Sequence, residues 1–557
     1  MKTVPVEPRR DAAGSRLGTF GVNVALLLLS VAFFALPQPN LISNHGFPFV
    51  AYIAFVPLFL LVRRVSFRAS FIWGAAYGTL SYCVFTYWLA VFHPLAMYVI
   101  AALYFCWLLV TVPALKLVDT AFPKHGFIPQ WIIWVGYEFL KTRGFNGYSY
   151  GVIGYSQWTW TTVLQIASVF GVWGVSALVT FPSAWIAAGI KDRCGGPVRL
   201  WFADFRRFAR LNRVSGLVWC AVFAGTLLFG VVSRVDSSSE ETVRLALIQP
   251  NSDPWKGGIN AYKRDFRTLS RLSDEALAAR PGIDLIVWPE TAFIPRIDWH
   301  YRYREERESF DLVSSLLEYL DASPVPVVLG NDDAVLGPTD EGTIDRIDYN
   351  AVLLFTPGKN VIPPEPERYR KMHLVPFTEH FPYKRLFPWV YDLLLANDTH
   401  FWEKGDNPVV FEAAGLRFST PICFEDTFGY LSRRFVNAGA RAIVNLTNDA
   451  WAKSEPSQYQ HLSMAVFRAV ENRVPLVRAT ASGQTAYVDQ NGVVAAMAPS
   501  FTESWLVVDV PKIDDPPMTP YRFWGDVWGI AFAAGAVLSA LAALASITGM
   551  LTKLRNI

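Results

Sequence analysis

The sequence is poor in charge, in cysteine and in the residue spacings that bind metal ions. Charged residues make up only 17% of the chain, whereas hydrophobic residues make up 52%. This composition excludes an ordinary soluble globular protein. No set of Cys and His residues has the spacing of a metal site, so we expect no metal ion at His373 or His461.

The scarcity of cysteine leaves one thiol without a partner. Of the five cysteines, three lie in long apolar runs and one in a basic segment: Cys83, Cys106, Cys220 and Cys194. The fifth, Cys423, lies in the mixed-polarity stretch PICFEDTF. We expect no cysteine on its own side of a membrane with which it could form a disulfide. Such a thiol is either a buried small hydrophobic group or a reactive group.

Long apolar runs are abundant and unevenly placed. A run of about 20 residues is enough to cross a bilayer. Eight runs approach or exceed this length: 20–36, 47–62, 69–92, 95–118, 127–140, 162–190, 214–232 and 524–551. The sequence therefore predicts an eight-helix transmembrane bundle formed by 1–240 and 514–557, with a water-soluble domain, 241–513, inserted before the last span.

Basic residues are nearly absent from the loops on one side of this predicted bundle. The first two loops on that side contain no Lys or Arg, and the third contains only Lys141 and Arg143. Because basic loops stay in the cytoplasm, we expect both termini there and the 241–513 domain on the other side. The first run has no clear small-residue cleavage site after it, so we interpret it as a retained anchor.

The inserted region alternates β-rich apolar runs with helical stretches. Eight runs each read as a strand that ends in turn or polar residues: 243–251, 283–291, 324–332, 349–357, 416–424, 440–449, 475–483 and 485–492. Helical patterns at 262–279 and 458–472 lie between strands. The strands are too apolar to face water on either side, which predicts a layered α/β domain.

Three reactive side chains lie where predicted strands or loops end, the usual place for chemistry in such domains. Glu290 follows a strand, Lys371 lies in a proline-flanked loop, and Cys423 ends a strand and opens a helix-like segment. The start of a helix and a nearby lysine would both favour a thiolate. Taken singly, the three residues could also be a strand end, a surface charge and a buried thiol.

The chain order Glu290, Lys371, Cys423 resembles the triad of the carbon-nitrogen hydrolase (nitrilase) superfamily. With the predicted spans, the chain resembles the apolipoprotein N-acyltransferase family over nearly its whole length. The matching features are Trp255, WPE at 288–290, KMHLVPFTE at 371–379, ICFE at 422–425, NDAW at 448–451, QH at 460–461, ENRVPLVRAT at 471–480, GYSQ at 154–157 and PYRFWGD at 520–526. The chain departs from the family's usual residues at Phe424, Thr378, Ala452 and Ala481–Ser482, which bears on the shape of the pocket and not on the triad.

The resemblance implies a membrane protein whose nitrilase-like α-β-β-α sandwich faces the periplasm from the bacterial cell inner membrane. Glu290 would be the general base and Lys371 an oxyanion donor. Cys423 would carry an acyl chain as a thioester, in a ping-pong reaction, from a phospholipid donor to the N-terminal amine of a diacylglyceryl cysteine in an apolipoprotein acceptor. Supporting or substrate-binding roles fall to four residues: Glu379, Glu425, Phe424 and Trp255. No cofactor, metal or nucleic acid is expected, and we expect a monomer.

Two other functions fit parts of the pattern. A membrane-anchored amidase or nitrilase-type hydrolase would use the same triad but would transfer the acyl group to water. A scaffold or transporter would use the bundle alone. The complete triad argues against a scaffold, and the spans contain few of the buried charges expected along a transport path.

Overall fold

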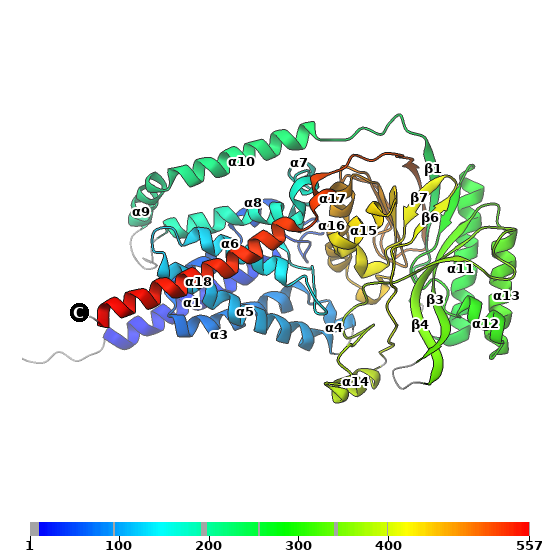
Figure 1. The fold of residues 1–557 in the computed structure, drawn as a ribbon, viewed down its shortest axis with the longest axis horizontal. Helices are drawn as coiled ribbons and strands as arrows, with labels where there is room; N and C mark the ends of the chain where they lie inside the picture. The colour runs from blue at the N-terminus through cyan, green and yellow to red at the C-terminus, as the bar shows by residue number, and fades with distance from the viewer. Residues whose placement is uncertain are drawn as a thin grey trace, which may run out of the picture.

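The protein has a helical part at one end and a domain of two β-sheets at the other (Figure 1). The computed structural model describes residues 11–92, 95–190, 198–253, 257–338, 343–397 and 399–555. The C-terminus lies at the end of the helical part that is farthest from the sheets. The last helix therefore returns along the helical part after the chain has completed the sheet domain.

The helical part contains a helix in or near every predicted apolar run. Its longer helices are α1 (Asp11–Ala35), α3 (Phe67–Phe85), α5 (Ala96–Ala121), α6 (Phe127–Leu140), α8 (Ala167–Gly189), α10 (Arg213–Val232) and α18 (Val527–Arg555). Shorter helices are η1 (Pro48–Ile53), α2 (Val56–Arg64), α4 (Leu89–Phe92), η2 (Ile153–Gln157) and α7 (Thr161–Leu164). The basic segment after α8 also contains a helix, α9 (Val198–Leu211).

Five helices in the described ranges are long and apolar enough to cross a membrane, judged by length and composition. The stretches are Gly18–Ala35, Ala96–Ala121, Ala167–Gly189, Arg213–Val232 and Val527–Gly549. Two of the other predicted spans contain shorter helices, since α2 has 9 residues and α6 has 14, fewer than the roughly 20 that a bilayer requires. The count of eight spans stays a prediction.

The sheet domain contains two six-stranded sheets. Their strand orders are β12-β1-β2-β3-β4-β5 and β11-β10-β9-β8-β7-β6. The first sheet consists of β1 (Thr242–Gln249), β2 (Leu285–Val287), β3 (Val327–Pro338), β4 (Ile344–Phe355), β5 (Glu367–Arg370) and β12 (Ser504–Pro511). The second consists of β6 (Val410–Ala413), β7 (Leu416–Ser419), β8 (Ala442–Thr447), β9 (Leu476–Thr480), β10 (Ala486–Val488) and β11 (Val494–Met497).

The central strands of each sheet run parallel, and antiparallel strands flank them. β1, β2 and β3 are parallel neighbours in the first sheet, as are β7, β8 and β9 in the second. All eight predicted strands are present. The sequence did not predict β5, β6 and β11, which have only four residues each, or β12, which pairs along β1 at a sheet edge.

Apolar side chains fill the space between the two sheets and the space between each sheet and its helices. Leu247 and Val287 from the first sheet share a core with Phe418 and Val444 from the second. The other face of the first sheet packs on α11 (Gly258–Ala279) and α13 (Arg307–Ala322), and α12 (Ile297–Tyr303) lies beside β3. These layers confirm the predicted layered α/β domain and its two-sheet, nitrilase-like fold.

The second sheet faces the helical part through its own helices. These are α15 (Gly429–Asn437) and α16 (Glu455–Asn472), and α17 (Pro520–Trp524) leads on toward α18. Leu462, Val466 and Phe467 of α16 belong to the same apolar core as residues of the helical part, and α16 contacts α8. The helix α14 (Pro388–Leu395) stands apart from the sheets, near α4 (Figure 1). The sheet domain is therefore joined to the helical part through a buried interface.

Candidate active site

Glu290 lies just after strand β2, in a turn that a neighbouring strand touches closely. Gly330 of β3 packs on this turn, and a Cβ at that position would lie only 2.6 Å from the Glu290 Cα. The Glu290 side chain is buried. Its carboxylate accepts hydrogen bonds from Lys371 Nζ at 3.2 Å, Asn350 Nδ2 at 2.9 Å and the Asn448 backbone N–H at 2.9 Å. Three separate segments therefore fix the orientation of this carboxylate.

Lys371 follows the short strand β5 and is held between two carboxylates. Its backbone N–H donates to the Asn350 carbonyl at 2.8 Å. The side chain is 0% exposed, and Nζ donates to Glu290 at 3.2 Å and to Glu379 at 2.8 Å. Burial by itself lowers the pKa of the Lys371 ammonium, but the two carboxylates outweigh burial and raise that pKa above its ordinary value. Lys371 is therefore charged at neutral pH.

Glu379 contacts the lysine and its own loop at the same time. One carboxylate oxygen accepts from Lys371, and the other accepts from the Val375 backbone N–H at 2.9 Å. Burial raises the pKa of Glu379, and the Lys371 ammonium opposes that rise. The Glu379 carboxylate therefore joins the Lys371 ammonium to the backbone of the loop at Val375.

Cys423 opens a short 3-10 helix, η3 (Cys423–Thr427). Its φ of 48° is left-handed, which is uncommon for a residue other than glycine and occurs often at functional turns. Glu425, two residues on, is buried, and burial raises its pKa to about 7. Its carboxylate accepts hydrogen bonds from the backbone N–H groups of Ile422, Met372 and His373 and from the Tyr369 hydroxyl. Glu425 therefore connects the turn that contains Cys423 to the segment that follows Lys371.

The lysine that was expected to favour a thiolate at Cys423 does lower the pKa of the thiol, but burial outweighs it. Burial raises the pKa of the Cys423 thiol well above its ordinary value, and the Glu290 carboxylate raises it further, whereas Lys371 lowers it. The helix-like segment predicted to open at Cys423 does begin there, but it is divided into two helices. The backbone is extended at Phe428, so η3 ends and α15 begins separately at Gly429. A thiol in this environment would need a neighbouring base in order to act as a nucleophile.

Phe424 lines a cavity of about 100 Å³ between the sheet domain and the helical part. Other lining residues are Leu89, Phe92, Val99, Leu103, Tyr148 and Thr378. Thr378, where the sequence departs from the family pattern, thus lies at the same cavity as Phe424. The cavity is mostly apolar and adjoins the turn that carries Cys423. Trp255 lies outside the described residues.

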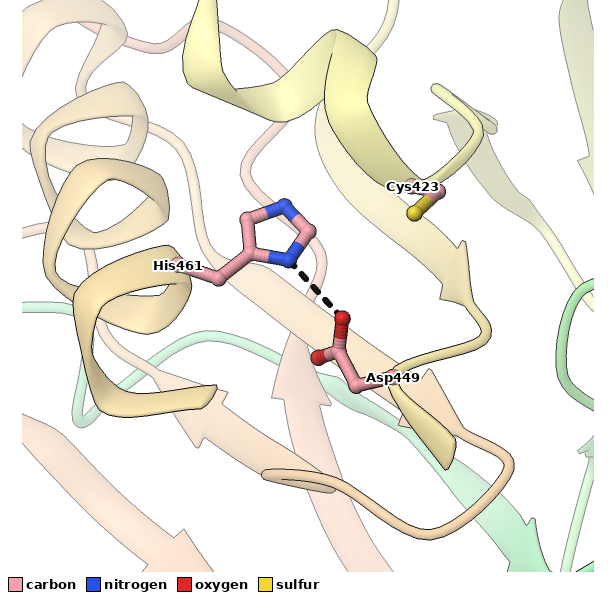
Figure 2. A group of neighbouring side chains, drawn as sticks. All are labelled: Cys423, Asp449 and His461. Atoms are coloured by element: carbon pink, nitrogen blue, oxygen red, sulfur yellow. Dashed lines mark hydrogen bonds and ion pairs between the residues drawn. The ribbon is translucent and has the colours of Figure 1, made fainter. Parts of the chain in front are cut away.

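Two further side chains lie beside the thiol. The sulfur of Cys423, one carboxylate oxygen of Asp449 and one ring nitrogen of His461 all lie within 4.8 Å of one another (Figure 2). The three come from η3, from the loop after β8 and from α16. Both ring nitrogens of His461 contact carboxylates, Nδ1 with Asp449 at 3.1 Å and Nε2 with Asp426 at 2.8 Å. Each ring nitrogen of His461 therefore contacts a carboxylate.

The sequence reasoning missed three residues that shape this site. Asn350 donates a hydrogen bond to Glu290 from its side chain and accepts one from the Lys371 backbone N–H. The Asn448 backbone N–H donates to Glu290. Gly330 has no side chain, which allows its backbone to lie close to that of Glu290. Asn448 was noted only as part of the NDAW motif, and Asn350 only as the start of a predicted strand. A polar amide at the head of an otherwise apolar strand is the signal that could have singled out Asn350.

Comparison with known proteins agrees with this picture. Residues 244–514 match the family model for carbon-nitrogen hydrolase, and residues 23–185 match that for the apolipoprotein N-acyltransferase N-terminal domain. Apolipoprotein N-acyltransferase 1 of Treponema denticola is 48% identical over 92% of this chain and 94% of its own length. Apolipoprotein N-acyltransferase 1 of Treponema pallidum is 48% identical over 95% of this chain and 96% of its own length.

Among solved structures, Nit3 of Saccharomyces cerevisiae, a nitrilase superfamily member, covers 51% of this chain and 93% of its own, at 18% identity and a TM-score of 0.34. The two-sheet domain and the matched models define a carbon-nitrogen hydrolase domain attached to helices apolar enough to span a membrane. Within that class, the chain belongs to the apolipoprotein N-acyltransferase family.

Proposed function

We propose that this chain transfers an acyl chain from a membrane phospholipid, through a thioester on Cys423, to the N-terminal amine of the diacylglyceryl cysteine of an apolipoprotein. The observation that carries the proposal is the buried Lys371 ammonium between Glu290 and Glu379, next to a buried thiol. The identity of 48% to proteins named apolipoprotein N-acyltransferase supports the choice of acceptor.

In the first half-reaction, Cys423 attacks the ester carbonyl carbon of the phospholipid. Glu290 accepts the thiol proton as the carbon–sulfur bond forms. The Lys371 ammonium has three N–H donors, and its bonds to Glu290 and Glu379 use two of them. The third donor serves the oxyanion, together with backbone N–H groups of the turn at Cys423. The ester carbon–oxygen bond then breaks, and Glu290 protonates the leaving oxygen to give a lysophospholipid.

In the second half-reaction, the amine of the acceptor attacks the thioester carbon. Glu290 takes a proton from the attacking nitrogen, and Lys371 again stabilises the oxyanion. The carbon–sulfur bond breaks as the amide forms, and the proton on Glu290 returns to the sulfur of Cys423. Each half-reaction releases one product before the other substrate reacts, so the kinetics are ping-pong.

The two apolar cavities support entry of acyl chains from the side. A groove of about 450 Å³ lies between α5, α6 and α18, with Trp107, Ile133 and Val537 among its lining residues. Leu103 lines both this groove and the cavity at Phe424. We assign the groove to the hydrocarbon chain of a lipid and the cavity at Phe424 to the portion near the ester. Phe424 would then contact the substrates, and the family pattern gives Trp255 a substrate-binding role as well.

The arrangement in the membrane is also part of the proposal. We divide the chain into a bundle of seven spans (1–240), a catalytic domain (241–513) and an eighth span with a cytoplasmic tail (514–557). The start of β1 at Thr242 and the end of β12 at Pro511 support these boundaries. The distribution of Lys and Arg supports a multi-pass protein of the bacterial inner membrane with its catalytic domain in the periplasm.

A monomer is the proposed state of assembly. Every described residue of α16 except Glu455 and Tyr459 is buried within the single chain. The helix layer over the second sheet is therefore occupied by the helical part, which leaves that face of the domain unavailable to a second copy.

A transfer assay tests the proposed function. Purified protein in detergent is given phospholipid labelled in one acyl chain and a synthetic diacylated lipopeptide with a free N-terminus. We expect the label on the lipopeptide as an amide, which survives hydroxylamine, and no transfer to an N-acetylated lipopeptide. Label released as free fatty acid, with none on the lipopeptide, would instead indicate a hydrolase and overturn the proposal.

A further inference from the structure

Four charged side chains next to Cys423 form a closed ring of hydrogen bonds. His461 contacts Asp426 through Nε2 at 2.8 Å and Asp449 through Nδ1 at 3.1 Å. Arg478 donates to the other oxygens of the same two carboxylates, at 2.8 Å to Asp426 and at 3.2 Å to Asp449. All four side chains are 0–3% exposed. Two carboxylates thus alternate with two nitrogen-bearing groups inside the protein.

The contacts of the ring fit a doubly protonated imidazole between two carboxylates. An ionised carboxylate only accepts hydrogen bonds, so each ring nitrogen of His461 must donate one. With His461 and Arg478 both positive, the ring carries no net charge, which suits its complete burial. Burial lowers the pKa of His461, but the two carboxylates outweigh it and raise that pKa to about 9.

The ring joins the two segments that hold the proposed nucleophile and the proposed base. Asp426 lies in the same 3-10 turn as Cys423. Asp449 directly follows Asn448, whose backbone N–H donates to Glu290 at 2.9 Å. A shift of either carboxylate therefore moves the thiol relative to the Glu290 carboxylate.

We propose that His461 is a positioning residue, whose imidazolium bridges Asp426 and Asp449 and thereby holds the Cys423 turn in register with the loop that binds Glu290. This inference rests on the proposed function, because it assigns Glu290 and Cys423 the roles of base and nucleophile. In this role His461 acts through the two carboxylates and not as an acid or base toward the substrate. Arg478 closes the ring from strand β9, on the opposite side from His461.

Loss of the His461 proton breaks the bridge. The charged groups around the imidazole are Asp426, Asp449 and Arg478, and the neighbouring titratable groups are Cys423 and Tyr150. A neutral imidazole donates only one hydrogen bond, so one carboxylate loses its bond from His461 and keeps only the bond from Arg478. The ring then carries a net negative charge beside the thiol. Both effects disfavour removal of the Cys423 proton.

The rate at which iodoacetamide alkylates Cys423 tests this inference without any lipid substrate. For His461→Gln we expect alkylation at pH 7 to be at least tenfold slower than in the wild-type protein, with the pH profile displaced to higher pH. The matched control is Ser463→Ala on the same buried helix, whose hydroxyl bonds only the Gln460 carbonyl. We expect the wild-type rate for it. A folded His461→Gln protein with the wild-type rate and pH profile would overturn the inference.

The protonation state of His461 gives a second test that needs no variant. In the solid-state ¹⁵N spectrum of histidine-labelled wild-type protein in lipid, one of the eight histidines should keep both ring nitrogens protonated at pH 8. Eight neutral histidines at pH 8 would overturn the inference even if His461→Gln failed to fold. Since neither experiment uses acyl transfer, a failure of the proposed function appears separately, as absence of transfer by the wild-type protein.

Discussion

The Lys371 ammonium donates a hydrogen bond to the Glu290 carboxylate across 3.2 Å, and both side chains are buried. The pair connects strand β2 with the end of strand β5, two positions 81 residues apart in the chain. In the proposed mechanism, this contact helps to orient the Glu290 carboxylate that accepts the thiol proton. In the same mechanism, the Lys371 ammonium brings a positive charge to the place where the reaction creates an oxyanion.

Replacement of Lys371 should therefore remove much of the catalysis. We expect Lys371→Ala to slow acyl-enzyme formation by at least 100-fold, since one oxyanion donor contributes about 3 kcal/mol in other enzymes. The control is Lys359→Ala, which changes an exposed lysine. We expect this variant to be acylated at the wild-type rate. Intact-protein mass spectrometry after timed mixing with phospholipid gives the rates. A Lys371→Ala protein that acylates within a factor of three of the wild type would contradict the assigned role.

The thermal stability of the wild-type protein should fall at alkaline pH. The pKa of His461 is raised from 6.5 to about 9 in the folded protein, so the folded state binds a proton more tightly than the unfolded state. The stability from this group is fully present below about pH 6.5 and is lost as the pH rises through about 9. The melting temperature of the protein, followed by differential scanning fluorimetry in detergent from pH 6 to 10, measures this loss of stability. If the Tm of His461→Gln falls as much between pH 6 and 10 as the Tm of the wild-type protein, another group causes the loss of stability.

Much of the fold could be predicted because its signals are local. The apolar runs and the alternation of strands with helices predicted the helical part, the inserted domain and eight of its twelve strands. Four-residue strands such as β5 escaped because they are too short to show a pattern. The helix-like segment predicted from Cys423 is present as two helices, η3 and α15, because the extended backbone at Phe428 interrupts it.

The site was only partly predictable, since its contacts are distant in sequence. The triad residues were selected by their order and their motifs. The bond from Asn448 to Glu290 spans 158 positions, and the bridge from His461 to Asp426 spans 35. No local pattern encodes such contacts, because they depend on how the two sheets and α16 pack together.

A bulky side chain at Leu103 should block the path between the two apolar cavities. We expect Leu103→Trp to reduce acylation by long-chain phospholipids at least tenfold while leaving acylation by a short-chain ester, such as p-nitrophenyl butyrate, within a factor of two. Leu103→Ala, which widens the same position, is the control and should accept both donors. Equal loss of both donors in Leu103→Trp would argue for a general structural defect and against a lipid path.

The orientation of the catalytic domain can be tested by fusions. A reporter that is active only in the periplasm, such as alkaline phosphatase, should be active when fused after Ser238 and inactive when fused after Arg193. The reason is the concentration of Lys and Arg in the segment that contains Arg193. A cytoplasmic reporter at the same two positions should give the opposite pattern. Periplasmic activity at Arg193 alone would reverse the topology.

The central claim is that Cys423 carries the acyl group, and the mass of the protein tests it most directly. With phospholipid and no acceptor, the wild-type protein should gain the mass of one acyl chain on the peptide that contains Cys423. Hydroxylamine or a diacylated lipopeptide should remove that mass, and Cys423→Ser and Glu290→Gln should not acquire a thioester. A wild-type protein that transfers label to the lipopeptide but never gains this mass, or a Cys423→Ala protein with full activity, would contradict the account.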